Sequence, residues 1–138
     1  MSECIFCEII RGERPAHVVL STEETLAFLD HSPLFHGHVL VVPHAHHVTL
    51  WETPPELLAS VLATVRRIAP AVVAGMKADG AFVANNNVIS QSVPHLHFHV
   101  IPRRKGDGLK GFFWPRHKYK DEGEAVAARE AIKAALTT

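Results

Sequence analysis

The chain has 138 residues, of which 47% are hydrophobic and 20% are charged. This is the size and composition of one folded domain with its own apolar core. Its 14 basic and 14 acidic side chains cancel, so no overall field draws it to nucleic acid or an acidic membrane. The N-terminus has no secretory-signal pattern, and no run reaches the roughly 20 apolar residues of a membrane span. We expect a single domain over residues 1–138, in the cytoplasm, with neither nucleic acid nor membrane as a partner.

Short apolar segments separated by polar turns predict β-strands in the first part of the chain. Residues 16–20 and 25–29 flank a polar turn, which is typical of a hairpin. Residues 38–42, bounded by a glycine and a proline, predict a third strand that is more buried.

A long amphipathic helix is predicted next. Thr53, two prolines and Glu56 form a capping-box pattern in which Thr53 is the N-cap. Apolar residues then recur every three to four positions as far as Met76, which predicts a core-facing stripe. Pro70 lies inside this pattern and removes one backbone donor. We therefore expect a kinked helix that continues to about Met76.

Two more strands and a terminal helix complete the predicted elements. The strands cover residues 81–84 and 96–101, with a polar loop between them, and the helix covers residues 122–136. Strands, a long helix, strands and a final helix indicate an α+β fold. We expect an antiparallel sheet of about five strands with one long helix and one C-terminal helix.

Three of the 11 histidines lie close together, at His95, His97 and His99. They alternate with apolar residues, so in a strand the three imidazoles share one face at offsets of roughly 6.6 Å. Imidazole titrates near neutrality, so one ring can be a neutral nucleophile while a cationic neighbour donates a proton. By itself the pattern also fits a metal cluster or solvent-facing histidines on an edge strand.

The sequence around these histidines resembles the signature of the histidine triad family. Residues 91–103 read Gln-Ser-Val-Pro-His-Leu-His-Phe-His-Val-Ile-Pro-Arg and match the family pattern His-φ-His-φ-His-φ-φ, with φ apolar, at every position. Segments 4–10, 26–30 and 37–43 follow the order found in bacterial members with an N-terminal Cys-x-x-Cys. The chain departs from its relatives at Ser90, where they usually have glycine, and in a shortened asparagine-to-glutamine loop.

This resemblance implies a nucleotide hydrolase with a histidine nucleophile. The middle histidine of the family maps onto His97 and implies a covalent nucleotidyl-histidine intermediate. His99 and Ser92 would assist departure of the leaving group, and the three residues are the implied catalytic set. The expected substrate is a purine nucleoside phosphoramidate, and no organic cofactor is expected.

The resemblance also implies how a nucleotide is held. Asp30 would bind the ribose hydroxyls with His31 beside the base, and Phe6 and Ile9 would line the base pocket. Which asparagine of residues 85–87 reaches phosphate stays open. The implied nucleotide-binding residues are Asp30, His31, Asn86, Gln91, Ser92, His97 and His99.

The only two cysteines suit a shared metal ion or a redox pair, because they are three positions apart. Such a pair supplies half of a tetrahedral zinc site, and bacterial relatives with this motif complete a structural zinc site with two histidines. The implied zinc ligands are Cys4, Cys7, His46 and His95. His44 and His47 are rival ligands that spacing does not separate from His46, and two free thiols are the alternative to a metal site.

Other functions remain open on the sequence. A dinucleoside polyphosphate hydrolase, a nucleotide-binding regulatory module with slow turnover and a zinc-stabilised interaction protein all fit the same motifs. The resemblance implies a homodimer, to which the helix after Thr53 could contribute. Residues 111–116, around Trp114, could either read the leaving group or form a surface loop.

Overall fold

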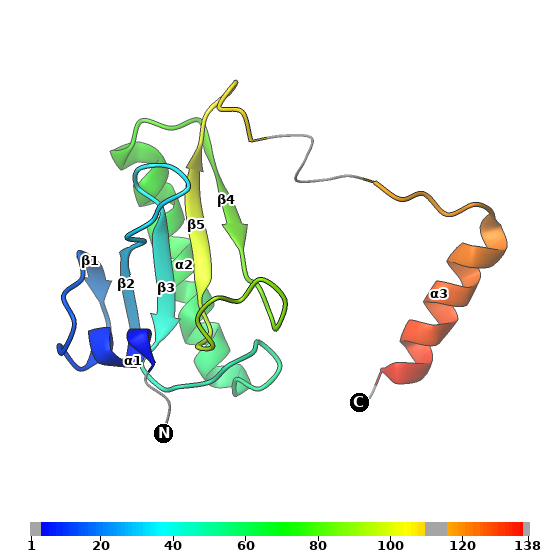
Figure 1. Cartoon of the computed structure of the whole chain (residues 1–138), viewed down its shortest axis with the longest axis horizontal. Coiled ribbons are helices and arrows are strands. Elements are labelled where there is room, and N and C mark those ends of the chain that lie inside the picture. The colour runs from blue at the N-terminus through cyan, green and yellow to red at the C-terminus, as the bar shows by residue number, and fades with distance from the viewer. Residues whose placement is uncertain (1–3, 110–115, 137–138) are drawn as a thin grey trace. The chain divides into compact units, whose positions relative to one another are not determined.

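The computed structural model describes residues 4–109 and 116–136 (Figure 1). The chain divides into two compact units, Met1–Asp107 and Gly108–Thr138, and the expectation of a single domain stays a prediction. Trp114 lies outside the described residues. The elements in chain order are α1 (Ile5–Ile10), β1 (Val18–Ser21), β2 (Thr25–Leu29), β3 (Val39–Pro43), α2 (Pro55–Gly75), β4 (Gly80–Ala84), β5 (Phe98–Arg103) and α3 (Glu122–Ala135).

The five strands form one antiparallel sheet in the order β1-β2-β3-β5-β4, which confirms the predicted α+β fold. Phe28 of β2 pairs with Leu40 of β3, and Leu40 pairs with His99 of β5. Since these residues lie in one row across the sheet, the end of β2, the start of β3 and the start of β5 are neighbours although they are far apart in sequence.

Helix α2 covers one face of the sheet and lies behind it in Figure 1. The predicted stripe explains this contact, because the buried side chains of α2 come from that stripe. On β5 and just before it, Leu96, Phe98 and Val100 belong to the core cluster under α2. The alternation of the strand then sends His97 and His99 to the opposite face, as the sequence predicts.

The opposite face of the sheet is covered in part by α1, a short helix that the sequence pattern did not predict. Its buried residue is Phe6, whose ring meets that of Phe28 edge-on at 5.4 Å between centroids. Leu26, Leu40 and Val42 belong to the same apolar cluster. The histidine face of the sheet is therefore also the face on which α1 packs.

The predicted capping box at the start of α2 is wrong. The N-cap is Pro54, and no side chain caps the helix. Thr53 is buried and its hydroxyl donates to the Thr49 carbonyl at 2.8 Å, while Glu52 accepts from the Thr49 hydroxyl at 2.9 Å. Thr53 thus closes the turn before the helix instead of capping it.

Helix α2 runs through Pro70 to Gly75, which confirms the predicted length. By length and composition alone, α2 is also apolar enough to cross a membrane. The search for an uninterrupted run of apolar residues in the sequence did not identify this segment. A core helix meets the same criterion, and Val61, Val65 and Ile68 of α2 are buried against the sheet.

Candidate active site

A cavity of about 510 Å³ lies on the α1 face of the sheet. Its walls combine apolar side chains of α1 and β2 with the histidines around the start of β5. Seven of the residues predicted from the sequence line it together: Phe6, Ile9, Asp30, His31, Ser92, His97 and His99. The fold therefore joins the implied base pocket, ribose ligand and catalytic residues in one cavity.

Hydrogen bonds assign the proton of the His97 ring. Its Nδ1 lies 2.7 Å from the carbonyl oxygen of His95, and a carbonyl can only accept, so Nδ1 carries the proton. Nε2 then keeps its lone pair, which is the form a nucleophile needs. The ring is 3% exposed, and this burial lowers the pKa of His97 below its ordinary value, so the ring is neutral near pH 7.

A relay of hydrogen bonds assigns the proton of His99 in the same way. The backbone N–H of Leu34 donates to Nδ1 of His38 at 3.0 Å, so the proton of His38 is on Nε2. This Nε2–H donates to Nδ1 of His99 at 2.9 Å. The proton of His99 is therefore on its own Nε2, ready to donate to a ligand in the cavity.

Burial, and then the neighbouring His97 and His38, lowers the pKa of His99 to about 4. In the free protein this disfavours the cationic neighbour that the sequence suggested for the nucleophile. His99 is instead a neutral donor whose proton position is set by His38. The negative charge of a bound phosphate would favour protonation of such a ring.

Asp30 follows β2 and is the acidic residue of the cavity wall. Its Oδ1 accepts the backbone N–H of Ser32 at 2.9 Å, and its Oδ2 lies 3.6 Å from Nε2 of His38. A carboxylate with a remaining lone pair is a good acceptor for paired hydroxyls. His31, beside it, has a side chain that is 96% exposed and lies at the open side of the cavity.

The two predicted phosphate ligands in the loop before the triad, Gln91 and Ser92, point to different surroundings. Ser92 lines the cavity, whereas Gln91 does not. The Gln91 side chain accepts the N–H of Val88 at 3.0 Å and donates to the carbonyl of Val48 at 2.6 Å. The Gln91 side chain therefore stabilises the loop that precedes the triad and does not face the cavity.

The three consecutive asparagines have different roles. Asn85 donates from its amide to the carbonyl of His97 at 2.8 Å, and Asn87 donates to Asn85 at 2.6 Å. Among the described residues, Asn86 has no side-chain hydrogen bond and does not line the cavity. Asn86 is thus the one whose amide is not committed to the fold.

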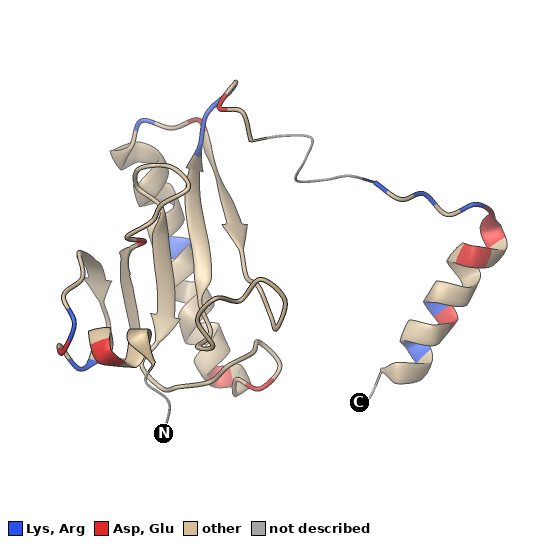
Figure 2. Ribbon diagram, in the orientation of Figure 1, with Lys and Arg blue, Asp and Glu red and all other residues tan. Residues whose placement is uncertain are grey.

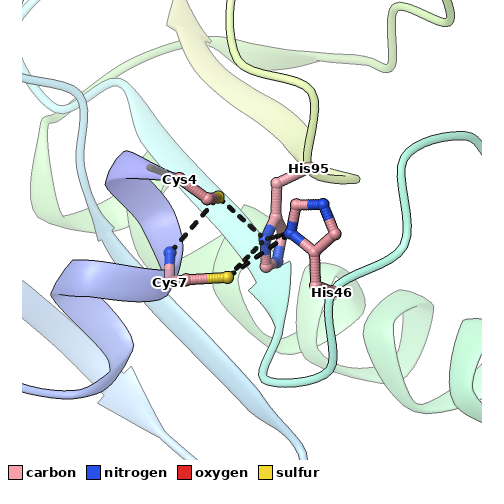
Figure 3. A group of neighbouring side chains, drawn as sticks. All are labelled: Cys4, Cys7, His46 and His95. Carbon is pink, nitrogen blue, oxygen red and sulfur yellow. Dashed lines mark hydrogen bonds between the residues drawn. The ribbon is translucent and has the colours of Figure 1, made fainter. Parts of the chain in front are cut away.

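Beside the cavity, two cysteines and two histidines converge on one point (Figure 3). Nδ1 of His95 lies 3.4 Å from Sγ of Cys4, 3.6 Å from Sγ of Cys7 and 3.2 Å from Nδ1 of His46. His95 is buried, and its Nε2 donates to the carbonyl of Pro43 at 2.9 Å. Its Nδ1 lone pair therefore faces the cluster.

The donor set and its spacing fit zinc. A tetrahedral ion with Zn–S near 2.3 Å and Zn–N near 2.0 Å needs N···S edges of about 3.5 Å and N···N edges of about 3.3 Å. The observed separations match both values. Among the rival histidines it is His46, and neither His44 nor His47, that belongs to the cluster.

Sequence reasoning missed several residues of the site, among them His17, His38 and Arg14. His38 is buried and holds His99, and its signal was a polar residue at the start of an otherwise apolar strand. Arg14 lines the cavity and had no sequence signal, because it lies in a polar loop whose approach to the cavity depends on the fold.

The family model of the HIT (histidine triad) domain matches residues 11–106. The adenosine 5'-monophosphoramidase HNT1 of Saccharomyces cerevisiae is 40% identical over 116 residues, which cover 81% of this chain and 70% of that protein. The crystal structure of a HIT family member from Bacillus subtilis matches with a TM-score of 0.89 and 36% identity over 99% of both chains. A Zn-bound histidine triad family protein from Mycobacterium smegmatis matches with a TM-score of 0.74 and 38% identity, covering 96% of this chain and 97% of that one.

The domain match covers most of the chain, and the triad that carries the resemblance lies together in one cavity. This chain belongs to the histidine triad family.

Proposed function

We propose that this histidine triad hydrolase cleaves the α-phosphate linkage of a purine nucleoside phosphoramidate and releases the nucleoside monophosphate. The observation that carries the proposal is the assignment of protons on two neighbouring rings. His97 has a free Nε2 lone pair and His99 a proton on Nε2, and both rings line one cavity with 5.0 Å between their centroids. The yeast relative that is named as an adenosine 5'-monophosphoramidase supports the choice of substrate class.

In the proposed reaction, Nε2 of His97 attacks the α-phosphorus and forms an N–P bond. The bond from phosphorus to the leaving amine breaks, and the amine takes a proton from His99 in the cationic form that bound phosphate favours, which leaves His99 neutral. Ser92 can hydrogen-bond the same leaving group. Water then attacks the phosphorus of the intermediate, breaks the bond to His97 and returns a proton to His99. Positioning and hydrogen bonding to the phosphoryl oxygens lower the barrier of both steps.

The nucleoside part would lie along the apolar side of the cavity. We assign the ribose hydroxyls to the carboxylate of Asp30 and the base to the surface formed by Phe6 and Ile9. Of the phosphate ligands implied by the resemblance, Asn86 has an uncommitted amide. Gln91 would have to give up two loop hydrogen bonds to reach the phosphate.

We further propose that the protein binds a structural zinc ion and acts as a homodimer. Cys4, Cys7, His46 and His95 would hold the ion, which would supply a cross-link between α1 and the segments after β3 and before β5. The match to the Zn-bound relative supports this ligand set. Metal analysis and light scattering of the purified protein test the two statements separately.

The function is tested by replacing the nucleophile. His97→Ala should abolish turnover of adenosine and guanosine phosphoramidates while nucleotide binding and the fold persist. Rapid quench with mass spectrometry should trap a nucleotidyl adduct on His97 in the parent. His36→Ala is the matched control, because His36 is exposed and does not line the cavity.

The same substrate panel decides between this proposal and its alternatives. Faster turnover of dinucleoside polyphosphates than of phosphoramidates would favour the polyphosphate hydrolase. Tight nucleotide binding without any turnover would favour the regulatory module. Unchanged turnover in His97→Ala would falsify the assignment of the nucleophile.

A further inference from the structure

Arg14 is a charged residue in the wall of a cavity whose α1 side is otherwise apolar. Among the described residues that line the cavity it is the only lysine or arginine. Figure 2 shows that the strands are mostly free of charged residues, whereas α1 and the loop after it carry both signs. The cavity lining also includes the apolar Ile5, Ile9 and Phe28, and His17 three residues after Arg14.

The order of the sheet places Arg14 at the far end of the cavity from the nucleophile. Arg14 lies four residues before β1, and the sheet continues through β2 and β3 to β5, which follows His97. Three strand spacings of about 4.8 Å separate β1 from β5, roughly 14 Å in all. Asp30, the proposed ribose ligand, directly follows β2, which lies between them. A nucleotide with phosphate at His97 and ribose at Asp30 therefore directs its base toward Arg14.

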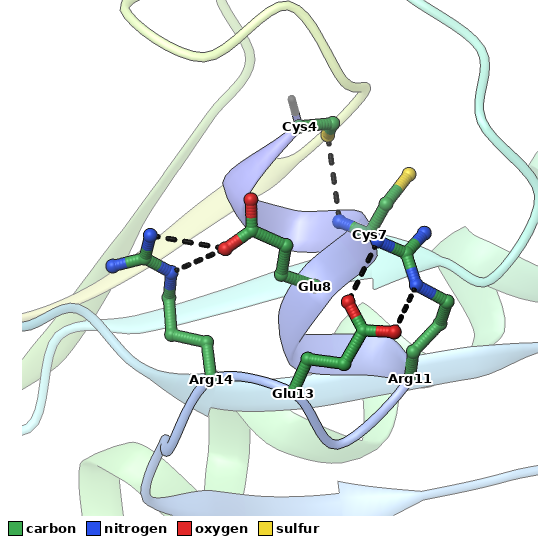
Figure 4. Close-up of polar contacts among 6 residues, drawn as sticks. All are labelled: Cys4, Cys7, Glu8, Arg11, Glu13 and Arg14. Carbon is green, nitrogen blue, oxygen red and sulfur yellow. Dashed lines mark hydrogen bonds and ion pairs between the residues drawn. The ribbon is translucent and has the colours of Figure 1, made fainter. Parts of the chain in front are cut away.

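A second side chain fixes the orientation of the guanidinium. Both Nε and Nη2 of Arg14 bind Oε1 of Glu8 at 3.0 Å, as Figure 4 shows. Glu8 lies on α1, has a side chain that is only 16% exposed and does not line the cavity. With this edge of the guanidinium occupied, the N–H groups of Nη1 remain for another acceptor.

Guanine and adenine differ in what they present to such a group. Guanine has two adjacent acceptors, O6 and N7, whereas adenine has N7 beside an amino donor. An arginine has only donors, so it pairs with the guanine edge and opposes the adenine amino group. With the base directed toward Arg14 as the proposed function has it, the Nη1 donors can pair with O6 and N7 of a guanine.

We infer that Arg14, held by Glu8, is a specificity-determining residue that makes this site prefer a 6-oxopurine nucleotide, of the guanine type, over an adenine nucleotide. The inference rests on the proposed function for the direction in which the nucleotide lies. It concerns the base alone and leaves the choice of leaving group open.

The inference is tested by calorimetric binding of guanosine, inosine and adenosine monophosphate to the full-length protein. Inosine monophosphate keeps O6 and N7 but lacks the 2-amino group of guanosine. The parent should bind the guanosine and inosine nucleotides about tenfold more tightly than the adenosine nucleotide. In Arg14→Met the three affinities should agree within about threefold, because the stem is kept and the donors are lost.

Arg11→Met is the matched control. Arg11 pairs with Glu13 in the same loop at 2.9 Å (Figure 4), but both side chains are more than half exposed and Arg11 does not line the cavity. This variant should keep the parent's preference. Since Arg11 and Arg14 have the same charge, the comparison separates base reading from a general loss of positive charge.

Several results would overturn the inference. One is inosine monophosphate binding like adenosine monophosphate, since the 2-amino group would then be what is read. Another is an equal loss of affinity for all three nucleotides in Arg14→Met. Turnover that depends on His97 without any base preference would sink the inference and leave the proposed function standing. A guanine preference without turnover would support the inference and contradict the proposed function. Failure to bind any nucleotide would contradict both the inference and the proposed function.

Discussion

His38→Phe should slow catalysis although His38 does not line the cavity. Phenylalanine fills the same buried space but removes the donor to His99, so that ring can turn or take the other tautomer. A hydrogen bond to a buried polar group is worth about 1 to 3 kcal/mol, which corresponds to a loss of roughly 5- to 150-fold in kcat. The Leu34 N–H, which donates to His38 at 3.0 Å, also loses its acceptor, so the free energy of unfolding should fall by about 1 to 2 kcal/mol.

The assay separates positioning from general damage. Steady-state kinetics on a nucleoside phosphoramidate should show a lower kcat with KM within about threefold of the parent, because the nucleotide does not contact His38. His38→Gln keeps an amide donor near the position of Nε2 and should recover most of the rate. A folded His38→Phe protein with kcat within twofold of the parent would refute the relay, as would equal losses in the two variants.

Chelation of zinc should lower Tm, because a ligand at 100 times its Kd adds about 2.7 kcal/mol of stability; Cys7→Ser should lose this response to a chelator in thermal melts. Stability should also fall as the solution is acidified from pH 6.5 to 4, since burial lowers the pKa of His99 to about 4. The unfolded ring accepts its proton first, so at most about 3 kcal/mol is lost through His99. His99→Asn should make the urea midpoint fall less over this range, while burial of His95, whose pKa is also lowered to about 4, keeps part of the dependence. Ser90→Gly should raise stability by about 1 kcal/mol, because Ser90 has a φ of 62° that favours glycine; Ser90→Ala should bring no gain in urea melts, and a gain there would contradict the backbone explanation.

The sequence could predict those features that depend on periodicity. Leu96, Phe98 and Val100 alternate with the histidines, so a buried strand face and a histidine face follow from one pattern. The stripe of α2 is predictable for the same reason, because a helix repeats its buried face every few residues. The positive φ of Ser90 also agrees with the family resemblance, which implies glycine at this position.

Features that depend on a long-range partner could not be predicted. Helix α1 is six residues long, too short for a periodic signal, and it packs through Phe6 against Phe28 of another element. Thr53 has a capping sequence, but its hydroxyl donates to the carbonyl of Thr49 in the buried turn before α2, a local alternative that the sequence pattern does not distinguish from a cap. Arg14 reaches the cavity only because Glu8 and the sheet order place it there. In each case local chemistry allowed two outcomes and tertiary structure selected one.

His95 links the cysteine cluster to the nucleophile through two different groups. Its imidazole Nδ1 faces Cys4 and Cys7, while its backbone carbonyl accepts the Nδ1 proton of His97. Any ion held by the cluster therefore also restrains the carbonyl that keeps the His97 lone pair on Nε2. In the triad, the outer two histidines then have distinct roles on either side of His97. The carbonyl of His95 fixes the proton of His97 on Nδ1, and in the proposed reaction His99 supplies a proton to the leaving group.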